Sequence, residues 1–169
     1  REGLVEVIPR RGMRVLPVSP TDMREIYDVL TALECMAAET LAARKPGSAE
    51  LKPLITATKA MEKALAQDDL DAWAAADEVF HERLVHMAGN KLLAQAVMSH
   101  WDRAHRARMF TLRLRPKPVN STHEHMALVE RLAVYSIGVA AGQVAFVELT
   151  SVLASQTKCS AGSAIPMHT

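Results

Sequence analysis

The sequence has little cysteine, few aromatic residues and almost no net charge. Its two cysteines, Cys35 and Cys159, form no C-x-x-C pair, which argues against a disulfide scaffold and against a thiolate zinc site. Twenty Lys and Arg stand against nineteen Asp and Glu, so the net charge of +1 creates no global attraction for nucleic acid or an anionic membrane. Any such binding is therefore expected to be local or to belong to a part of the protein outside this sequence, and a reducing cytoplasm is the expected location.

Long apolar runs and common catalytic motifs are also missing. The most apolar stretch, residues 132–147, has 16 residues and contains Ser136 and Gln143. A membrane-spanning helix needs roughly 20 apolar residues, so we expect no membrane contact. The first residues show no secretory leader. Glycine-rich phosphate loops, the nucleophile elbow and H-E-x-x-H are absent, which argues against nucleotide binding and the common hydrolase chemistries.

The first 18 residues alternate in polarity as strands do. Residues 4–8 and 13–18 flank the turn sequence Pro9-Arg10-Arg11-Gly12, which predicts a two-stranded hairpin. An isolated hairpin is marginally stable in water, so it must belong to a larger unit. We interpret residues 1–18 as the end of another domain.

The rest of the chain has helical periodicity. Apolar residues recur at three and four from Ser19 and Pro20 to the break at residues 44–47. The last 36 residues carry only Glu148 and Lys158 as charges but can form one more apolar helix. We therefore predict an all-α, antiparallel bundle of about six helices over residues 19–157, followed by a disordered tail over 158–169. The middle four helices are expected at 49–66, 69–87, 91–113 and 119–133.

Two polar residues interrupt the apolar stripe of the predicted helix 69–87. Asp77 and His81 are four residues apart and fall among apolar positions rather than opposite them, so both can point toward one ion in the core. In the helix 119–133, His123 and His125 lie about 200° apart around the axis, so only one faces inward. Leu128 and Leu132 follow His125 at helical spacing, which makes His125 the inward residue.

These residues predict a divalent metal site made of Asp77, His81 and His125. One carboxylate and two imidazoles suit zinc, with nickel, manganese or iron as alternatives. An ion pair between Asp77 and His81 without a metal explains the same spacing, and this alternative stays open. His86 is expected at the edge of the apolar stripe, in contact with solvent.

A basic run begins in the second half of the predicted helix 91–113 and continues beyond its end, and it suggests a second set of binding residues. A solvated basic face is the ordinary interpretation. The sharper hypothesis places Arg103 inward, one turn beyond His100, where its guanidinium could bind a carboxylate through two hydrogen bonds. His100 shares a face with Leu93 and Val97 and is a second candidate for lining a cavity. The run consists of Arg103, Arg106, Arg108, Arg113, Arg115 and Lys117.

Three motifs together resemble the C-terminal effector domain, the FCD domain, of FadR-type GntR transcription regulators. They are Asp77-Glu78-Val79-Phe80-His81, the G-N-x-x-L phrase at residues 89–93, and His123-Glu124-His125. The opening hairpin resembles the wing of that family's winged helix, with Gly3-Leu4-Val5 before a basic turn. The resemblance extends to about residue 133.

The resemblance implies a homodimeric DNA-binding regulator that senses a small carboxylic acid, often on a metal held by one Asp and three His. Asp77, His81 and His125 match three ligands, whereas no histidine lies between His125 and His168 and only Glu148 falls near the fourth spacing. The family often has Arg where this chain has Leu30. The effector contacts then fall to Arg103 or Arg106, with His100 and Asn90 as further ligand-binding candidates.

The leading hypothesis is therefore a metabolite-sensing domain rather than an enzyme. Arg10, Arg11 and Arg14 of the wing could touch phosphates only, because major-groove readout needs a recognition helix upstream of Arg1. Two alternatives remain: a small metal-dependent enzyme, which lacks an evident general base, and a metal-free helical dimerisation module.

Overall fold

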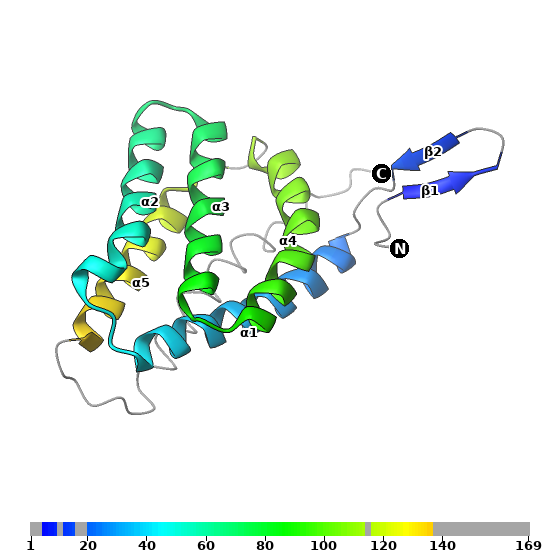
Figure 1. Cartoon of the computed structure of the whole chain (residues 1–169). Coiled ribbons are helices and arrows are strands. Elements are labelled where there is room, and N and C mark those ends of the chain that lie inside the picture. The colour runs from blue at the N-terminus through cyan, green and yellow to red at the C-terminus, as the bar shows by residue number, and fades with distance from the viewer. Residues whose placement is uncertain (1–4, 10–11, 16–19, 114–115, 137–169) are drawn as a thin grey trace.

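The computed structural model describes residues 5–9, 12–15, 20–113 and 116–136, and within these it shows a hairpin followed by five helices (Figure 1). The all-α prediction is confirmed, and the helix ends fall within three residues of the expected positions. The predicted sixth helix, Glu148 and the predicted tail at 158–169 lie outside the described residues. The elements are β1 (Val5–Ile8), β2 (Gly12–Val15), α1 (Pro20–Ala43), α2 (Ser48–Ala66), α3 (Leu70–Met87), α4 (Lys91–Leu112) and α5 (Val119–Ser136).

The hairpin is a two-stranded antiparallel sheet that projects away from the helices (Figure 1). Its register pairs Val5 with Val15 and Ile8 with Gly12. Gly12 has φ +94°, a backbone conformation that side chains with a Cβ rarely adopt, so glycine suits the end of this turn.

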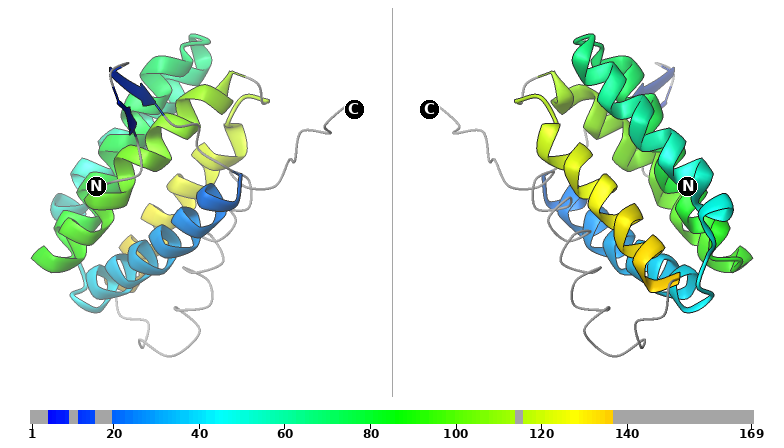
Figure 2. Two further views of the ribbon diagram at one scale, coloured as in Figure 1. Left: turned by 90° about the vertical axis from the view of Figure 1, so that its right-hand side faces the viewer. Right: turned by 90° about the vertical axis from the view of Figure 1, so that its left-hand side faces the viewer.

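The five helices pack as a ring. Helix α2 contacts α3 and α5, α3 contacts α4, and α1 closes the ring against α4 and α5 while also crossing α3. Figure 2 shows α5 and α1 side by side and α4 beside α1 at the other edge. Side chains from α1, α3 and α5 therefore meet inside the ring.

Short connections with side-chain caps fix the ends of α3 and α4. The Asp69 carboxylate accepts a hydrogen bond from the Ala72 amide at 2.9 Å and begins α3. The Asn90 side chain accepts from the amides of Leu92 and Leu93, both at 3.1 Å, and begins α4. Between them, Gly89 has φ +78°, the left-handed conformation that commonly ends a helix. These caps fix the register of α3, on which Asp77 and His81 lie.

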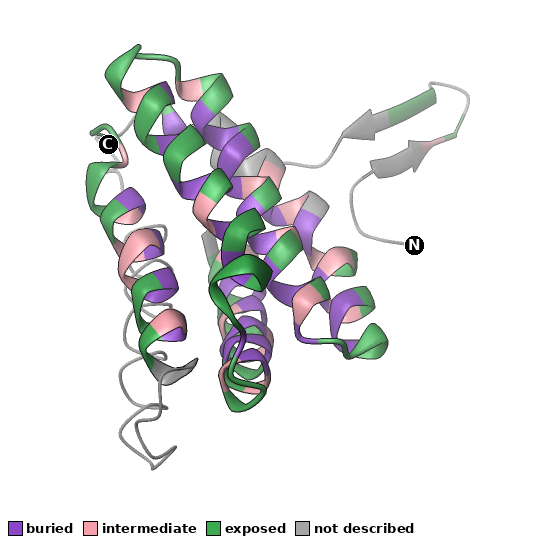
Figure 3. Cartoon of the chain, turned by 60° about the vertical axis from the view of Figure 1, so that its left-hand side comes forward, coloured by how far each residue is buried: buried purple, intermediate pink, exposed green. Residues whose placement is uncertain are grey.

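Buried apolar side chains form two clusters that meet at α3 and α1. The main core joins α1, α2, α3 and α5 and includes Leu54, Met61 and Phe80. The α4 core joins α1, α3 and α4 and includes Val97 and Trp101. Figure 3 shows the buried positions on the inner faces of the helices and the exposed positions on the outer faces, as the helical periodicity predicts. The polar residues considered next lie where the two clusters meet.

Candidate metal centre

Three polar side chains from two helices meet in the interior. Asp77 and His81 come from α3 and His125 from α5, and all three are at most 3% exposed. The Nε2 atoms of the two histidines are 3.2 Å apart. Asp77 Oδ1 lies 3.7 Å from Nε2 of His81 and 3.3 Å from Nε2 of His125. The prediction that these three side chains face one point in the core is therefore confirmed.

Local packing explains why these side chains meet. The four-residue spacing puts Asp77 and His81 on one face of α3. Helix α5 is fixed against α3 by a buried hydrogen bond, in which Trp73 Nε1 donates to the Thr122 hydroxyl at 2.8 Å. Since Thr122 is one turn before His125, this contact sets the depth of the His125 ring. Phe80 packs edge-on against that ring, with centroids 4.5 Å apart.

The outer nitrogens of both imidazoles face oxygen atoms. His125 Nδ1 donates to the Ser121 carbonyl at 2.6 Å. His81 Nδ1 lies 2.9 Å from Oε1 of Glu34, a residue of α1 that is 5% exposed. An imidazole with its proton on Nδ1 has a free lone pair on Nε2, which is the atom that binds a metal. Both rings thus direct Nε2 toward Asp77.

The separations between these three atoms suit a tetrahedral ion. An ion with bonds of about 2.1 Å keeps tetrahedral ligand atoms about 3.4 Å apart. The observed separations are 3.2, 3.3 and 3.7 Å. Within the described part of the chain, this trio is the one group of three or more His, Cys, Asp or Glu side chains whose ligand atoms converge. The donor set of one carboxylate and two imidazoles also suits zinc, so the residues fit a divalent metal.

The charge of the buried groups fits a divalent cation as well. Glu34 and Asp77 supply two carboxylates, and their described ion-pair partners are imidazoles. Burial alone lowers the pKa of His81, but Glu34 and Asp77 outweigh it and raise this pKa from 6.5 to about 9. Without a metal, the His81 imidazolium balances one of the two carboxylates. With a divalent ion and neutral imidazoles, the two carboxylates are fully balanced.

Known proteins resemble this chain in sequence and in fold. The family model described as the FCD domain matches residues 25–134, a range that includes Glu34, Asp77, His81, Thr122 and His125. The chain belongs to the FCD domain family. The match confirms the resemblance found from the motifs around Asp77, Asn90 and His125.

A curated relative also matches this FCD chain in sequence. It comes from Agrobacterium vitis and is described as an uncharacterized HTH-type transcriptional regulator in the TAR-I ttuE-ttuC' intergenic region. The two are 48% identical over 89 residues, which make up 52% of this chain and 52% of the relative. The chain thus spans about half the length of this relative.

Two solved structures share the fold of the FCD chain. One is described as a putative transcriptional regulator GntR from Rhodococcus sp. RHA1, with a TM-score of 0.75, 18% identity, and coverage of 97% of this chain and 75% of that one. The other is described as E. coli McbR/YncC, with a TM-score of 0.72, 17% identity, and coverage of 94% and 75%. The curated relative and the first structure are named as regulators rather than enzymes, in accord with the prediction that this chain is not an enzyme. No described helix is long and apolar enough to cross a membrane.

The other predicted residues lie outside the buried trio. The side chain of His86 is 55% exposed, and His123 is also exposed, as predicted for both. His100 is half-buried on α4. Asn90 is exposed and caps α4, so the structure does not bring it to the trio. Residues outside the description are Arg10, Arg11 and the side chains of Arg14 and Arg106.

Arg103 and the end of the basic run have different surroundings. Arg103 is half-buried, and among the described residues its Nε atom is buried without a hydrogen-bond partner. In contrast, Arg113 contacts Asp71 at 2.7 Å, and Lys117 contacts Asp68 at 2.7 Å, both at the surface. The solvated-face interpretation therefore holds for Arg113 and Lys117, whereas the Nε atom of Arg103 is buried.

Glu34 is a residue of this site that sequence reasoning missed. The signal was nevertheless present, because Glu34 lies four residues after Leu30 and four before Ala38, both buried on α1. A carboxylate within an apolar stripe was the same signal that identified Asp77.

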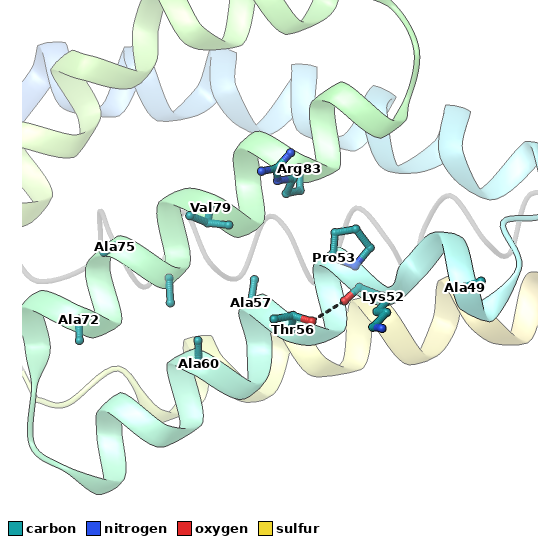
Figure 4. A pocket seen from close by; sticks show the side chains of 11 residues that line it. Ala49, Lys52, Pro53, Thr56, Ala57, Ala60, Ala72, Ala75, Val79 and Arg83 are labelled. Carbon is teal, nitrogen blue, oxygen red and sulfur yellow. Dashed lines mark hydrogen bonds between the residues drawn. The ribbon is translucent and has the colours of Figure 1, made fainter.

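An open groove on the outer surface between α2 and α3 is separate from the trio (Figure 4). Its volume is about 800 Å³, and alanine side chains form most of its lining. Lys52, Pro53 and Arg83 lie toward one end, and the Thr56 hydroxyl donates to the Lys52 carbonyl at 2.9 Å. None of the three candidate ligands lines this groove.

Proposed function

We propose that this chain is the effector-sensing part of a transcriptional regulator and binds a small carboxylic acid through a divalent metal. The single observation that carries this proposal is the meeting of Asp77, His81 and His125 at separations of 3.2–3.7 Å in the core. The family match and the regulators named among its relatives support the regulatory role.

Asp77, His81 and His125 would hold the ion. A bound divalent ion would supply a Lewis acid for a carboxylate oxygen of the effector. Zinc suits this donor set best, with nickel and manganese as alternatives. The half-buried Arg103 is the proposed second anchor for the acid, because its Nε donor has no described partner.

The remaining parts of the proposal concern DNA and assembly. We assign residues 1–18 to the wing of a winged-helix DNA-binding domain, since residues 5–8 and 12–15 pair as the antiparallel hairpin that the sequence predicts. Arg10, Arg11 and Arg14 then contact phosphates without reading sequence. We also propose a homodimer, in which the acid binds two arrangements with different affinity and so changes DNA binding.

Metal content tests the first step. We expect near-stoichiometric metal in the dialysed wild-type chain, measured by elemental mass spectrometry after incubation with zinc, nickel or manganese. His81→Ala and His125→Ala should lose it. The matched controls His86→Ala and His123→Ala remove exposed histidines from the same two helices and should keep it. Absence of metal from the wild type after all three incubations contradicts the proposal.

Effector binding tests the second step. The metal-loaded chain should gain thermal stability with small carboxylic acids, without turnover, and the metal-free chain should not. Arg103→Gln should weaken the gain, whereas Arg83→Gln, an exposed arginine on α3, should leave it unchanged.

A metal-free module is a second candidate that one observation favours. The protonated His81 ring lies between Glu34 and Asp77 and satisfies both carboxylates in part without any ion. This candidate predicts no bound metal and no acid-dependent stabilisation, so the same two experiments separate it from the sensing domain.

A further inference from the structure

Among the described residues, Glu34 and Asp77 are the two buried acidic residues, and Glu34 is not a member of the trio. Its Oε1 atom contacts Nδ1 of His81, on the side of the ring away from Nε2. Because Nε2 is the atom that faces Asp77 and His125, Glu34 lies behind the ring rather than among the three converging atoms. Its place in the site is therefore outside the ligand set.

The Glu34 carboxylate and the Nδ1 atom of His81 contact each other in the buried interior. The His81 and Glu34 side chains are 4% and 6% exposed, and their closest atoms are 2.9 Å apart. This contact is an ion pair, and among the described residues neither Oε1 of Glu34 nor Nδ1 of His81 has a hydrogen-bond partner. Since buried polar groups need partners, a small rotation that aligns these two atoms is favourable.

The aromatic neighbours of the His81 ring do not determine which of its nitrogens carries the proton. Trp101 lies against His81 with centroids 4.9 Å apart and planes tilted by 44°, and Phe80 approaches at 5.7 Å. These contacts limit where the ring can move, but they do not select which nitrogen carries the proton. That selection depends on the polar neighbours of the two ring nitrogens, which are Glu34 at Nδ1, 2.9 Å away, and Asp77 and His125 at Nε2, 3.7 and 3.2 Å away.

We propose that Glu34 is a positioning residue, which holds the proton of His81 on Nδ1 and thereby directs the Nε2 lone pair to the metal. This inference rests on the proposed metal site. It assigns α1 a part in a centre whose ligands come from α3 and α5. His125 has the equivalent restraint within its own helix, from the Ser121 carbonyl at 2.6 Å.

Four substitutions separate positioning from charge. Glu34→Leu removes the acceptor, Glu34→Asp keeps the charge but shortens the reach, and Glu34→Gln keeps an oxygen in reach without the charge. Glu39→Leu is the matched control, because Glu39 is an exposed residue of the same helix. Zinc affinity measured by competition with a chelator should fall about 10–100-fold in Glu34→Leu, the usual effect of losing such a partner.

The ranking of the variants decides the inference. We expect Glu34→Gln to lose less affinity than Glu34→Asp, and Glu39→Leu to match the wild type. Wild-type affinity in Glu34→Leu overturns the inference. So does wild-type affinity in Glu34→Asp together with a full loss in Glu34→Gln, because charge rather than position then governs binding. Circular dichroism identifies a variant that fails to fold, in which case the Asp and Gln variants carry the comparison.

Nitrogen NMR of His81 separates this inference from the metal proposal. In zinc-bound wild type the shifts should show Nε2 as the ligating atom and a proton on Nδ1. In the metal-free wild type, the Nδ1 proton should be protected from exchange, and Glu34→Leu should lose that protection. If the wild type binds no zinc, the metal proposal fails while this measurement still tests the contact. Equal protection in wild type and Glu34→Leu overturns the positioning role.

Discussion

Helix α3 carries two aspartates, each of which contacts a basic side chain, and the two contacts differ most in their exposure to solvent. Asp71 contacts Arg113 at 2.7 Å, with side chains that are 61% and 67% exposed. Asp77 contacts His125 at 3.3 Å, with side chains that are 2% and 1% exposed. Water and salt screen the first pair, so the expected gain is small. The second has lost its hydration and depends on protein groups or an ion for compensation.

The comparison shows that distance alone does not rank ion pairs. The shorter contact belongs to the surface pair, where Asp71 remains hydrated without Arg113. The buried carboxylates Asp77 and Glu34 must instead be balanced by protonated histidine or a cation. The buried charged residues therefore point to a functional site, whereas the surface ion pair of Asp71 and Arg113 does not.

The largest expected effect is the difference between His81→Ala and Asp71→Ala. In metal-free protein, His81→Ala should lower the free energy of unfolding by about 3–5 kcal/mol, because it removes the imidazolium and leaves the buried carboxylates of Glu34 and Asp77 uncompensated. Asp71→Ala should cost at most about 1 kcal/mol. Urea unfolding measures both. Equal losses in the two variants contradict the comparison.

The second effect is a pH dependence carried by His81. Its pKa is about 9 when folded against 6.5 when unfolded, so its contribution to stability is complete below pH 6.5 and is lost as the pH rises through 9. The free energy of unfolding of the metal-free protein should fall by of the order of 1–3 kcal/mol between pH 6 and pH 9. Cys35 does not titrate in this range, because burial raises its pKa to about 11. His81→Gln should flatten this slope, and His86→Gln should not. A wild-type slope that is already flat refutes the assignment to His81.

A third effect concerns the hydrogen bond that fixes α5. Thr122→Val removes the acceptor of the buried Trp73 indole and should cost about 1–3 kcal/mol in unfolding free energy. The control Thr56→Val changes an exposed threonine whose hydroxyl bonds only within its own helix, and should cost a few tenths at most. Metal affinity should also fall in Thr122→Val, because the hydrogen bond that holds α5, and with it the His125 ring, in position against α3 is lost. Identical stability of the two variants would count against this role.

The smallest effect is that of the surface pairs. Arg113→Ala should change the free energy of unfolding by less than about 1 kcal/mol. Raising the salt concentration from 0.1 M to about 1 M should remove most of this difference, since the Debye length falls to about 3 Å. A loss that survives high salt would show that the Arg113 side chain stabilises by packing instead.

Much of the fold could be predicted because the helical signals are local. Asp69, Gly89 and the apolar spacing of α3 mark its two ends and its inner face without reference to other helices. The same spacing placed Asp77 and His81 inside and His86 outside. For the basic run, the sequence left a solvated face and an inward Arg103 as alternatives, because the surroundings of Arg103 and Arg113 depend on neighbours from other elements.

The sequence by itself determined which residues form each helix and which face of it is buried, because periodicity within one helix fixes the direction of every side chain relative to its axis. It thereby determined that Asp77, His81 and His125 point inward. Only the tertiary structure decided that α3 and α5 bring these groups within 3.7 Å, and that α1 places Glu34 behind His81. The relative depth and rotation of packed helices depend on how their side chains interlock, and contacts such as Trp73 with Thr122 arise only when the ring of helices has formed.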